Sequence, residues 1–486
     1  MFYEPNLLID GELVPATGGR TFESINPATE QVVNVAADAS VADTERAILA
    51  ARRAFDETTW SKDQAFRSHC LHQLVAALRA NTEELRALTV SEVGVPISMT
   101  SGPALEGTFD LTEFYANLAG TYNDTTDLGN IEGYGSLHHR WVKREAFGVV
   151  SAISAYNYPH QLNLAKLAPS LAAGCTVVLK GAPDTPLVTL ALGQLIAEHT
   201  DIPAGVVNIL TSSEVAPGAV MTTDPNVDMI TFTGSTAVGR SIMAAAAPTL
   251  KKVFFELGGK SAFLVLDEES LAMAAMFCTF GAMSHAGQGC AVTSRLVVPR
   301  ALYDDAIGAV QQMMAGIAVG DPTDPANYMG PLISAKQRER VQSHVDQAVA
   351  DGATVAAGGG RPEGLDKGFF FSPTLIAGAD ENSAIAQNEI FGPVLVVLPH
   401  DGDDDAVRVA NNSIFGLSAS VAAADHQRAR DVADRIRTGT VSVNGGLWHA
   451  PDAPFGGYKQ SGIGRENGVA GLEEFLQTKT LSEPAT

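Results

Sequence analysis

The chain has 486 residues, a length that predicts two or three domains rather than one simple core. Its 32 Lys and Arg residues against 55 Asp and Glu residues give a formal net charge of -23. Such an acidic surface repels phosphate backbones and anionic membranes, which argues against nucleic-acid or lipid partners. The four cysteines show no Cys-x-x-Cys pairing, so we expect free thiols in a reducing compartment and no metal site.

The first 147 residues predict a short strand followed by surface helices. Residues 7–12 read as a strand and turn, and residues 41–55, 64–85 and 110–120 have helical spacing. The first ten residues contain no basic, apolar leader, and no uncharged apolar run approaches the roughly 20 residues that a membrane span needs. We therefore expect a cytoplasmic protein.

A polar segment at residues 121–135 lacks any helical period and leads into an exposed strand at residues 136–143. This segment is either a protruding hairpin used for subunit contact or a plain surface excursion.

From Gly148 onward, short apolar strands alternate with helices. Strands are expected at residues 149–154, 176–179, 206–210 and 229–232, with helices at 161–173, 187–199 and 236–247. This alternation predicts a doubly wound parallel sheet, whose ligands bind at the carboxyl ends of the strands. A second alternating block from residue 261 to about 444 includes a helix at 334–351. It predicts a second α/β domain, with the boundary near residues 256–260.

Cys290 follows a helix-like run at residues 271–284 and the tight turn Gly287-Gln288-Gly289. A thiol on such a turn can face a cleft, and nearby dipoles or a base can lower its pKa enough for nucleophilic attack at neutral pH. The alternative is a small, buried hydrophobic side chain.

Four further positions carry polar chemistry at the ends of predicted strands. Glu256 precedes two glycines and can act as a general base if burial raises its pKa. Asn157 offers a neutral donor for an oxyanion. The turn from Gly234 to Gly239 opens a helix whose N–H groups suit a phosphate, and Lys180 could reach a cofactor hydroxyl or phosphate. Each could instead be an ordinary strand-end or turn residue.

Several of these stretches occur in an order that resembles the aldehyde dehydrogenase family. The matching motifs are Tyr-Asn-Tyr-Pro from residue 156, Val-Val-Leu-Lys ending at 180, Phe-Thr-Gly-Ser-Thr from 232, Glu-Leu-Gly-Gly-Lys from 256, Gly-Gln-Gly-Cys ending at 290, Glu-Ile-Phe-Gly-Pro from 389, Asn-Gly at 444, and Pro-Phe-Gly-Gly-Tyr-Lys-Gln-Ser-Gly-Ile-Gly-Arg-Glu ending at 466. An Ile-Asp-Gly near the N-terminus also fits, so the resemblance covers nearly the whole chain.

The resemblance implies a nucleophile at Cys290, a general base at Glu256, and an oxyanion hole formed by Asn157 and the Cys290 backbone N–H. Glu466 resembles a second acidic residue that relays protons. The cofactor residues implied by the resemblance are Ile153, Tyr156, Lys180, Gly234, Ser235, Gly239, Leu257, Gln337, Glu389 and Phe391. The substrate tunnel would be lined by Tyr158, Leu162, Ala165, Ser284, Trp448, His449 and Phe455.

The implied reaction is oxidation of an aldehyde to the acid with NAD, through a thiohemiacetal and a thioester on Cys290. Pro183 stands where many NAD-preferring relatives carry Glu, which leaves NADP open as well. Ala165 and Ser284 are small, and the implied tunnel contains no Arg to pair with a substrate carboxylate, so we expect apolar or aromatic aldehydes. Transfer of the acyl group to coenzyme A and a catalytically idle structural relative are the alternatives. The presence of Glu256 favours hydrolysis.

The resemblance also implies a division of the chain. Residues 1–120 and 143–255, with part of 454–474, would form the dinucleotide-binding domain, and residues 256–443 the catalytic domain. Residues 121–142 and 475–486 would be oligomerisation strands, the first forming a small bridging hairpin. We therefore expect a homodimer or homotetramer.

Overall fold

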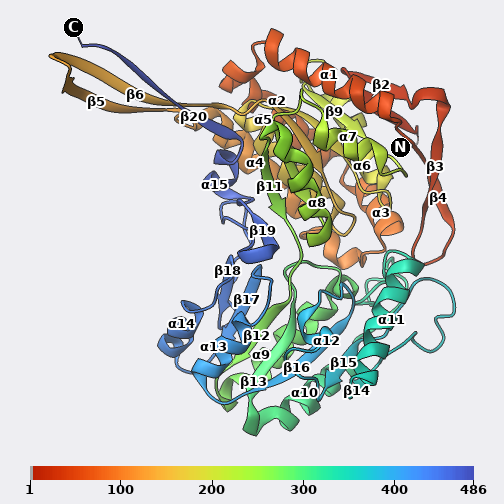
Figure 1. Cartoon of the computed structure of the whole chain (residues 1–486). Helices are drawn as coiled ribbons and strands as arrows, with labels where there is room; N and C mark the ends of the chain where they lie inside the picture. Colours follow the sequence, from red (N-terminus) through yellow and green to blue (C-terminus); the bar gives the residue numbers. More distant parts are fainter. Residues whose placement is uncertain (1–3, 486) are drawn as a thin grey trace.

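The computed structural model describes residues 4–485, which form two α/β lobes and a projecting β-arm (Figure 1). Residues 1–3 and 486 belong to the first and last predicted segments and lie outside the described part. Among residues 4–485, no helix has the length and apolar character needed to cross a membrane.

The first lobe is built on an eight-stranded sheet with the order β19-β11-β10-β7-β8-β9-β1-β2. Its parallel strands are β7 (Val149–Ile153), β8 (Thr176–Lys180), β9 (Val207–Leu210), β10 (Met229–Thr233) and β11 (Lys252–Glu256). Strands β1 (Asn6–Ile9), β2 (Glu12–Pro15) and β19 (Gly462–Ile463) add antiparallel edges. The predicted doubly wound α/β fold is confirmed, with the difference that this sheet is mixed at its edges.

Helices cover the sheet of the first lobe. They are α1 (Val41–Glu57), α2 (Gln64–Ala80), α3 (Thr82–Val93), α4 (Glu106–Thr121), α5 (Pro159–Ala173), α6 (Pro186–His199), α7 (Ala216–Thr223), α8 (Thr236–Ala246) and α15 (Gly468–Glu473). The single helix expected at residues 64–85 is two helices, because the chain leaves helical geometry at Asn81. The sequence pattern also gave no sign of α7, which has only eight residues.

The second lobe contains a seven-stranded sheet with the order β14-β15-β16-β13-β12-β17-β18. Its strands are β12 (Ser261–Val265), β13 (Thr293–Pro299), β14 (Thr354–Ala357), β15 (Thr374–Ala377), β16 (Val394–His400), β17 (Ser418–Ala422) and β18 (Thr440–Val443). Only β14 runs antiparallel to its neighbour. The helices of this lobe are α9 (Glu268–Met283), α10 (Tyr303–Ala315), α11 (Ala335–Ala350), α12 (Ala384–Gln387), α13 (Asp403–Asn411) and α14 (His426–Ala433).

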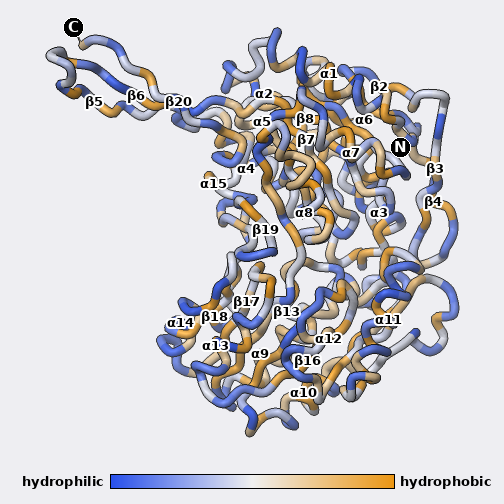
Figure 2. Tube along the Cα trace, viewed as in Figure 1, coloured by the Kyte–Doolittle hydropathy of each residue, from blue (hydrophilic) through white to orange (hydrophobic). Residues whose placement is uncertain are grey.

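Each lobe has its own hydrophobic core, and the core residues follow the apolar strands in Figure 2. Trp60 and Phe254 are among the largest buried side chains of the first core, and Phe371 belongs to the second. Because the cores are separate, the strand ends of the two sheets can face each other across a cleft. The chain passes from one sheet to the other between Glu256 and Ser261. The proposed domain division itself stays a prediction.

A two-stranded ribbon, β3 (Thr21–Ile25) and β4 (Val32–Ala37), also links the lobes along one side of the molecule (Figure 1). At its tip, the backbone carbonyl of Pro27 accepts a hydrogen bond from Phe369 N at 2.9 Å. The Glu30 carboxylate accepts one from Gly368 N at 2.8 Å. The ribbon therefore ties the first lobe to a loop of the second lobe, away from the connection at Glu256.

The arm is a three-stranded antiparallel sheet of β5 (Thr125–Gly133), β6 (Ser136–Ala146) and β20 (Leu476–Pro484), in the order β20-β6-β5. It projects clear of both lobes, and the C-terminal strand lies along it (Figure 1). The polar segment at 121–143 is thus a protruding hairpin. Its outer strands, β5 and β20, each have one edge that pairs with no other described strand.

Candidate active site

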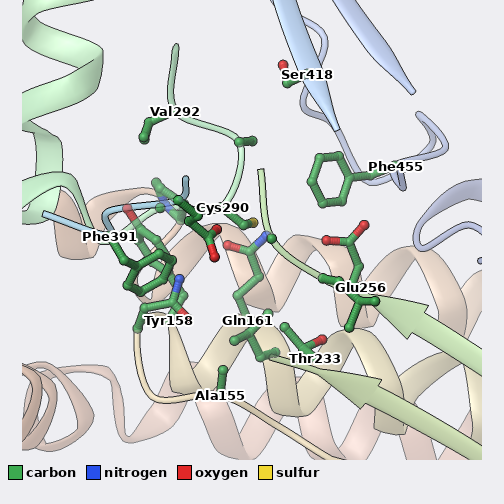
Figure 3. A pocket seen from close by; sticks show the side chains of 18 of the residues that line it. Ala155, Tyr158, Gln161, Thr233, Glu256, Cys290, Val292, Phe391, Ser418 and Phe455 are labelled. Atoms are coloured by element: carbon green, nitrogen blue, oxygen red, sulfur yellow. The ribbon is translucent and has the colours of Figure 1, made fainter. Parts of the chain in front are cut away.

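A cavity of about 610 Å³ is lined by residues of both lobes, among them Cys290 and Glu256. In Figure 3 the side chains of Cys290, Glu256 and Phe455 face this cavity from different segments of the chain. Thr233 and Glu256 enter from the adjacent ends of β10 and β11, where they are paired in register. The carboxyl ends of the first sheet therefore meet the cysteine of the second lobe.

The cysteine lies on a constrained turn after α9. His285 and Ala286 both have left-handed backbones, with φ of 48° and 53°, and Gly287 follows with φ of 71°. A Cβ on Gly287 would lie 2.1 Å from the carbonyl oxygen of Gly392. Only glycine fits at this position, because any side chain would collide with the backbone of the neighbouring segment.

Gln288 fixes this turn from within the protein. It is completely buried, its side-chain oxygen accepts a hydrogen bond from Ile333 N at 2.9 Å, and its Nε2 donates to the carbonyl of His285 at 3.2 Å. Its own carbonyl accepts a hydrogen bond from Asn157 Nδ2 at 2.8 Å. This last bond joins the loop after β7 to the turn that carries Cys290.

Asn157 lies in the lining of the cavity that contains Cys290. Its side chain is buried. The amide nitrogen has two N–H groups, and one is used by the bond to Gln288. The second N–H remains available for an oxygen formed next to Cys290.

Glu256 is only 1 % exposed, and its Oε1 has no hydrogen-bond partner in the described part of the chain. Burial and, to a lesser extent, the nearby Glu466 raise the pKa of Glu256 well above its usual value. The Oγ1 of Thr233, beside it on β10, is likewise buried without a partner among residues 4–485. Both unpaired atoms belong to residues that line the cavity, as expected where a water or ligand completes the hydrogen bonding.

A buried ion pair between Lys166 and Glu466 lies near Glu256. Lys166 Nζ lies 3.1 Å from Glu466 Oε1, with both side chains almost fully buried. The ammonium group also lies 5.7 Å from the centre of the Phe254 ring and 3.4 Å from Thr231 Oγ1. Glu466 itself lines the cavity. The pair thus places a carboxylate near Glu256 while a lysine partly balances its charge.

The electrostatics of Cys290 differ from the sequence-based expectation. The residue is half-buried, and desolvation, together with the carboxylates of Glu256, Glu389 and Glu466, raises the pKa of the thiol well above its usual value. The lowering of this pKa that the sequence allowed is not seen in this arrangement of charges. A raised pKa disfavours the thiolate, so nucleophilic attack requires a group that accepts the thiol proton.

One side of the cavity has features that suit a dinucleotide. Helix α8 begins at Thr236, directly after the end of β10, and its first turn is capped by the Ser235 hydroxyl, which accepts a hydrogen bond from Val238 N at 3.3 Å. Further N–H groups at this helix start are available to a phosphate. Gly234, Ser235, Leu257 and Tyr156 line the same cavity.

Residues of the second lobe form another wall of the side of the cavity that suits a dinucleotide. Tyr156 meets Phe391 edge to face, with ring centres 5.9 Å apart. Gln337 donates to the carbonyl of Phe391 at 2.7 Å, so it supports the Phe391 backbone. Glu389 accepts a hydrogen bond from Gly259 N at 2.9 Å, and a Cβ on Gly259 would lie 2.3 Å from the Cys290 carbonyl. The segment after Glu256 is therefore packed against the cysteine.

Three of the expected cofactor residues lie beyond the lining of the main cavity. Ile153 ends β7 and is half-buried. Lys180 ends β8, where burial lowers its pKa to about 8. At Gly239, a Cβ would lie within 2.8 Å of the Leu257 side chain, so glycine allows α8 to pack closely on the segment after Glu256.

The other side of the cavity is largely aromatic. Tyr158, Leu162, Ser284, Trp448, His449 and Phe455 all line it. Trp448 and Phe455 are stacked with ring centres 5.4 Å apart, and burial lowers the pKa of His449. Ala165 does not line the cavity. It packs in the core of the first lobe on α5, so it provides no room for a substrate.

Sequence reasoning missed several residues of this site, namely Lys166, Gln161, Thr233, Gln288, Arg340 and Val292. Lys166 left a detectable signal, because it is the one Lys, Arg, Asp or Glu in a mostly apolar helix. The anchoring role of Gln288 depends on Ile333, which is distant in sequence, and no local pattern indicates it. No cluster of His, Cys, Asp or Glu suited to a metal ion occurs in the described chain.

Comparison with known proteins gives matches along almost the whole chain. Residues 13–481 match the model of the aldehyde dehydrogenase family. A 3-succinoylsemialdehyde-pyridine dehydrogenase of a Pseudomonas species is 39 % identical over 477 residues, which is 97 % of each chain. Aldehyde dehydrogenase 1 of Tanacetum cinerariifolium is 37 % identical, covering 98 % of this chain and 95 % of that protein.

Solved structures of similar sequence have the same fold. The C291A mutant of aldehyde dehydrogenase C from Pseudomonas syringae, in complex with NAD+ and octanal, matches with a TM-score of 0.93 and 37 % identity, covering 98 % of this chain and 96 % of that one. Betaine aldehyde dehydrogenase from Staphylococcus aureus, in complex with NAD+, matches with a TM-score of 0.95 and 34 % identity, covering 99 % and 94 %.

Replacing Gly287 with Ala tests the constraint on the turn. We expect Gly287→Ala to lower the free energy of unfolding by about 3 kcal/mol, because the left-handed backbone and the contact with Gly392 both penalise a Cβ. Gly378 has almost the same φ, 70°, with open space around it, so Gly378→Ala should cost only about 1 kcal/mol. Urea unfolding of both variants measures the difference, and equal losses would contradict the argument.

Proposed function

The chain belongs to the aldehyde dehydrogenase family, and from this premise we propose that it oxidises an apolar or aromatic aldehyde to the carboxylic acid with NAD+. The observation that carries the proposal is the convergence of Cys290, Asn157 and Glu256 on one cavity, beside a helix N-terminus suited to a phosphate. Nucleophile, oxyanion donor and base are the three groups that acyl chemistry at a thiol requires.

The residues of the cleft fit a nicotinamide dinucleotide. The start of α8 offers backbone N–H groups for the pyrophosphate, and the Glu389 carboxylate lines the cavity where ribose hydroxyls can donate to it. When bound, the dinucleotide supplies the hydride acceptor for the oxidation, and its positive ring charge opposes the effect of the carboxylates on the Cys290 pKa. The remaining chemistry belongs to the protein.

Attack begins at the Cys290 sulfur. Its raised pKa means that the thiol proton must be removed as the carbon–sulfur bond forms, and Glu256 lines the same cavity. The aldehyde oxygen becomes negatively charged, and the free N–H of Asn157 stabilises it together with the Cys290 backbone N–H. Because Asn157 is fixed by its bond to Gln288, this donor needs no rearrangement during the reaction.

Hydrolysis completes the cycle after the substrate carbon has been oxidised to a thioester on Cys290. Glu256 takes a proton from a water molecule that attacks the thioester, and the acid and the thiol are released. A raised pKa makes this carboxylate a stronger base than an exposed Glu. The proton that Glu256 takes from the thiol during attack must leave Glu256 before this step, and we propose Glu466, which is paired with Lys166, as the group that relays it. A base in this position favours hydrolysis over transfer to coenzyme A.

Charge supports the proposed substrate class. Among the described residues that line the cavity, Arg340 is the only Lys or Arg, and it donates to the backbone carbonyl of Glu389 on the cofactor side. The substrate side presents aromatic rings and the Glu466 carboxylate. A substrate carboxylate would lose its hydration there without gaining an ionic partner. We therefore propose that semialdehydes with a terminal carboxylate are poor substrates.

The residues expected at the adenosine end of the cleft do not exclude NADP+ as a second cofactor. Pro183 follows Lys180 by three residues and has no carboxylate that could repel a 2′-phosphate. We propose that NAD+ is used and that NADP+ is accepted as a weaker alternative.

The arm supports assembly of identical subunits, as a dimer or tetramer. The apolar residues Leu128, Ile131 and Leu137 on it are between 42 % and 45 % exposed, and the outer strands have free edges. Such edges pair with other strands unless they are covered. We propose that residues 121–142 and 475–486 of one subunit pack against a second subunit. We also propose that the protein works in the cytoplasm.

The activity is tested by following the absorbance of reduced nicotinamide with NAD+ and an aldehyde panel. We expect octanal and benzaldehyde to be oxidised with a kcat/KM at least tenfold above that of succinate semialdehyde, since a buried carboxylate would be unpaired. Cys290→Ala should abolish the signal, and Asn157→Ala should lower kcat by about 100- to 1,000-fold. A faster reaction with succinate semialdehyde would contradict the substrate class, and full activity of Cys290→Ala would contradict the mechanism.

The Glu256–Glu466 interaction predicts a change in pH dependence. The base must lose its proton before it can act, so kcat should rise with pH through the raised pKa of Glu256. Glu466→Gln removes a negative charge and leaves Lys166 unpaired, and both effects lower that pKa. We expect the acid limb of the kcat profile to shift to lower pH. Glu113→Gln on the exposed face of α4 is the control, and an unmoved limb in Glu466→Gln would refute the coupling.

Oligomeric state is measured by light scattering after size exclusion. The wild-type chain should elute at two or four times its mass of 50.8 kDa. The triple variant Leu128→Lys, Ile131→Lys and Leu137→Lys adds charges to the arm and should shift the population toward 50.8 kDa. Val215→Lys, at an exposed site on the first lobe, should leave the mass as in the wild type. A monomeric wild-type protein would exclude the proposed role of the arm.

A further inference from the structure

A second chamber adjoins the main cavity on the substrate side. It has a volume of about 200 Å³, and three residues, Pro103, Gln161 and His449, line both spaces. Its other walls include Thr108 near the start of α4 and Asn467, directly before α15. The shared lining makes this outer chamber a continuation of the space in front of Cys290.

Two amide side chains in the outer chamber have no partner. Asn467 is only 4 % exposed, lines the chamber, and its side-chain amide makes no hydrogen bond within residues 4–485. Gln161, on α5 at the junction of the two spaces, likewise has no side-chain partner in the described structure. Asn467 is buried and Gln161 is half-buried, so a water or a ligand group in the chamber can complete the hydrogen bonds of both side chains.

The backbone of Asn467 points to the same conclusion. Its φ of 63° and ψ of 164° lie in a region that is essentially restricted to glycine. The side chain of Asn467 does not offset this strain by capping α15, because it makes no cap hydrogen bond. An asparagine held in such a backbone, with its amide unsatisfied inside a chamber, is suited to binding a group that enters from the main cavity.

The charges around the outer chamber disfavour an anionic ligand. Asp110 is the only ionisable carboxylate or cation in its lining within the described chain, and Glu466 lies nearby on the wall of the main cavity. Asp110 is paired with Arg79 at 3.4 Å, so an anionic group would meet carboxylates and no Lys or Arg in the lining of the chamber itself. The stacked rings of Trp448 and Phe455, adjacent to His449, provide an apolar surface for the part of a ligand that lies closer to Cys290.

We propose that the outer chamber binds the distal end of an elongated aldehyde, and that this end is an uncharged hydrogen-bonding group such as a carboxamide, a ketone or a nitrogen heterocycle. The aldehyde reaches Cys290, the apolar middle of the molecule lies against the aromatic wall, and Asn467 and Gln161 bind the polar end. This proposal rests on the aldehyde-oxidising function and narrows its substrate class.

The first test compares three aldehydes of similar length: nonanal, 8-oxooctanamide and 8-oxooctanoate. In the wild-type enzyme with NAD+, kcat/KM for the amide should exceed that for nonanal by about tenfold, the value of one or two neutral hydrogen bonds, and the carboxylate should be the poorest substrate. A series of ω-oxo amides from four to ten carbons locates the effect. The advantage over the matching unsubstituted aldehyde should appear only in the longer members, because the chamber is separate from the space at Cys290.

The second test removes the two amides. Asn467→Gly deletes the side chain where the backbone already favours glycine, and Gln161→Leu keeps the volume but removes the polar group. Each variant should reduce the preference for 8-oxooctanamide over nonanal about threefold to tenfold, and the double variant should abolish it. Gln194→Leu on the surface of α6 is the matched control and should retain the wild-type preference.

The outcomes distinguish a failure of the proposed aldehyde oxidation from a failure of the proposed role of the outer chamber. If the wild-type protein oxidises none of the aldehydes, the proposed function fails. If it oxidises nonanal but shows no preference for the amide, or if the preference survives in the double variant, the function stands and the outer chamber has no role in substrate selection. A preference equal at all chain lengths would also overturn the proposal.

Discussion

The hydrogen bond from Asn157 Nδ2 to the carbonyl of Gln288, 2.8 Å long, is the contact on which the site depends. It joins the loop after a strand of the first sheet to the turn that carries the cysteine of the second lobe. Neither lobe alone contains the complete proposed reaction centre, since the proposed oxyanion donor comes from one lobe and the proposed nucleophile from the other. Because Gln288 is fully buried and also bonded to Ile333, the turn is anchored on both sides.

The second feature of the site is an excess of negative charge in a desolvated place. Glu256, Glu389 and Glu466 surround one thiol, and all three raise its pKa. Such an arrangement is unfavourable for a resting thiolate. Lys166 offsets one of the three carboxylates.

Much of this could be read from the sequence, because the relevant signals are local. Apolar strands alternating with helices predict the two α/β lobes, and the segment at 121–143 is polar because it projects into solvent. The shape of the cavity depends on contacts between distant segments and was harder to predict. Ala165 illustrates the limit, since it shares α5 with Leu162 yet packs into the core. The high pKa of Cys290 is another case, because three carboxylates from separate motifs cause it.

Strand β19 completes the edge of the first sheet from residues 462–463, beside the strand that ends in Glu256. Phe475, close to the C-terminus, packs edge to face on Phe254 in the same lobe. During synthesis on the ribosome, the first lobe is therefore without its edge strand until the second lobe has emerged. Part of the apolar surface of the first lobe stays uncovered until residues 462–475 have been made. Premature termination anywhere in the second lobe would leave a target for chaperones and proteases rather than a smaller working enzyme.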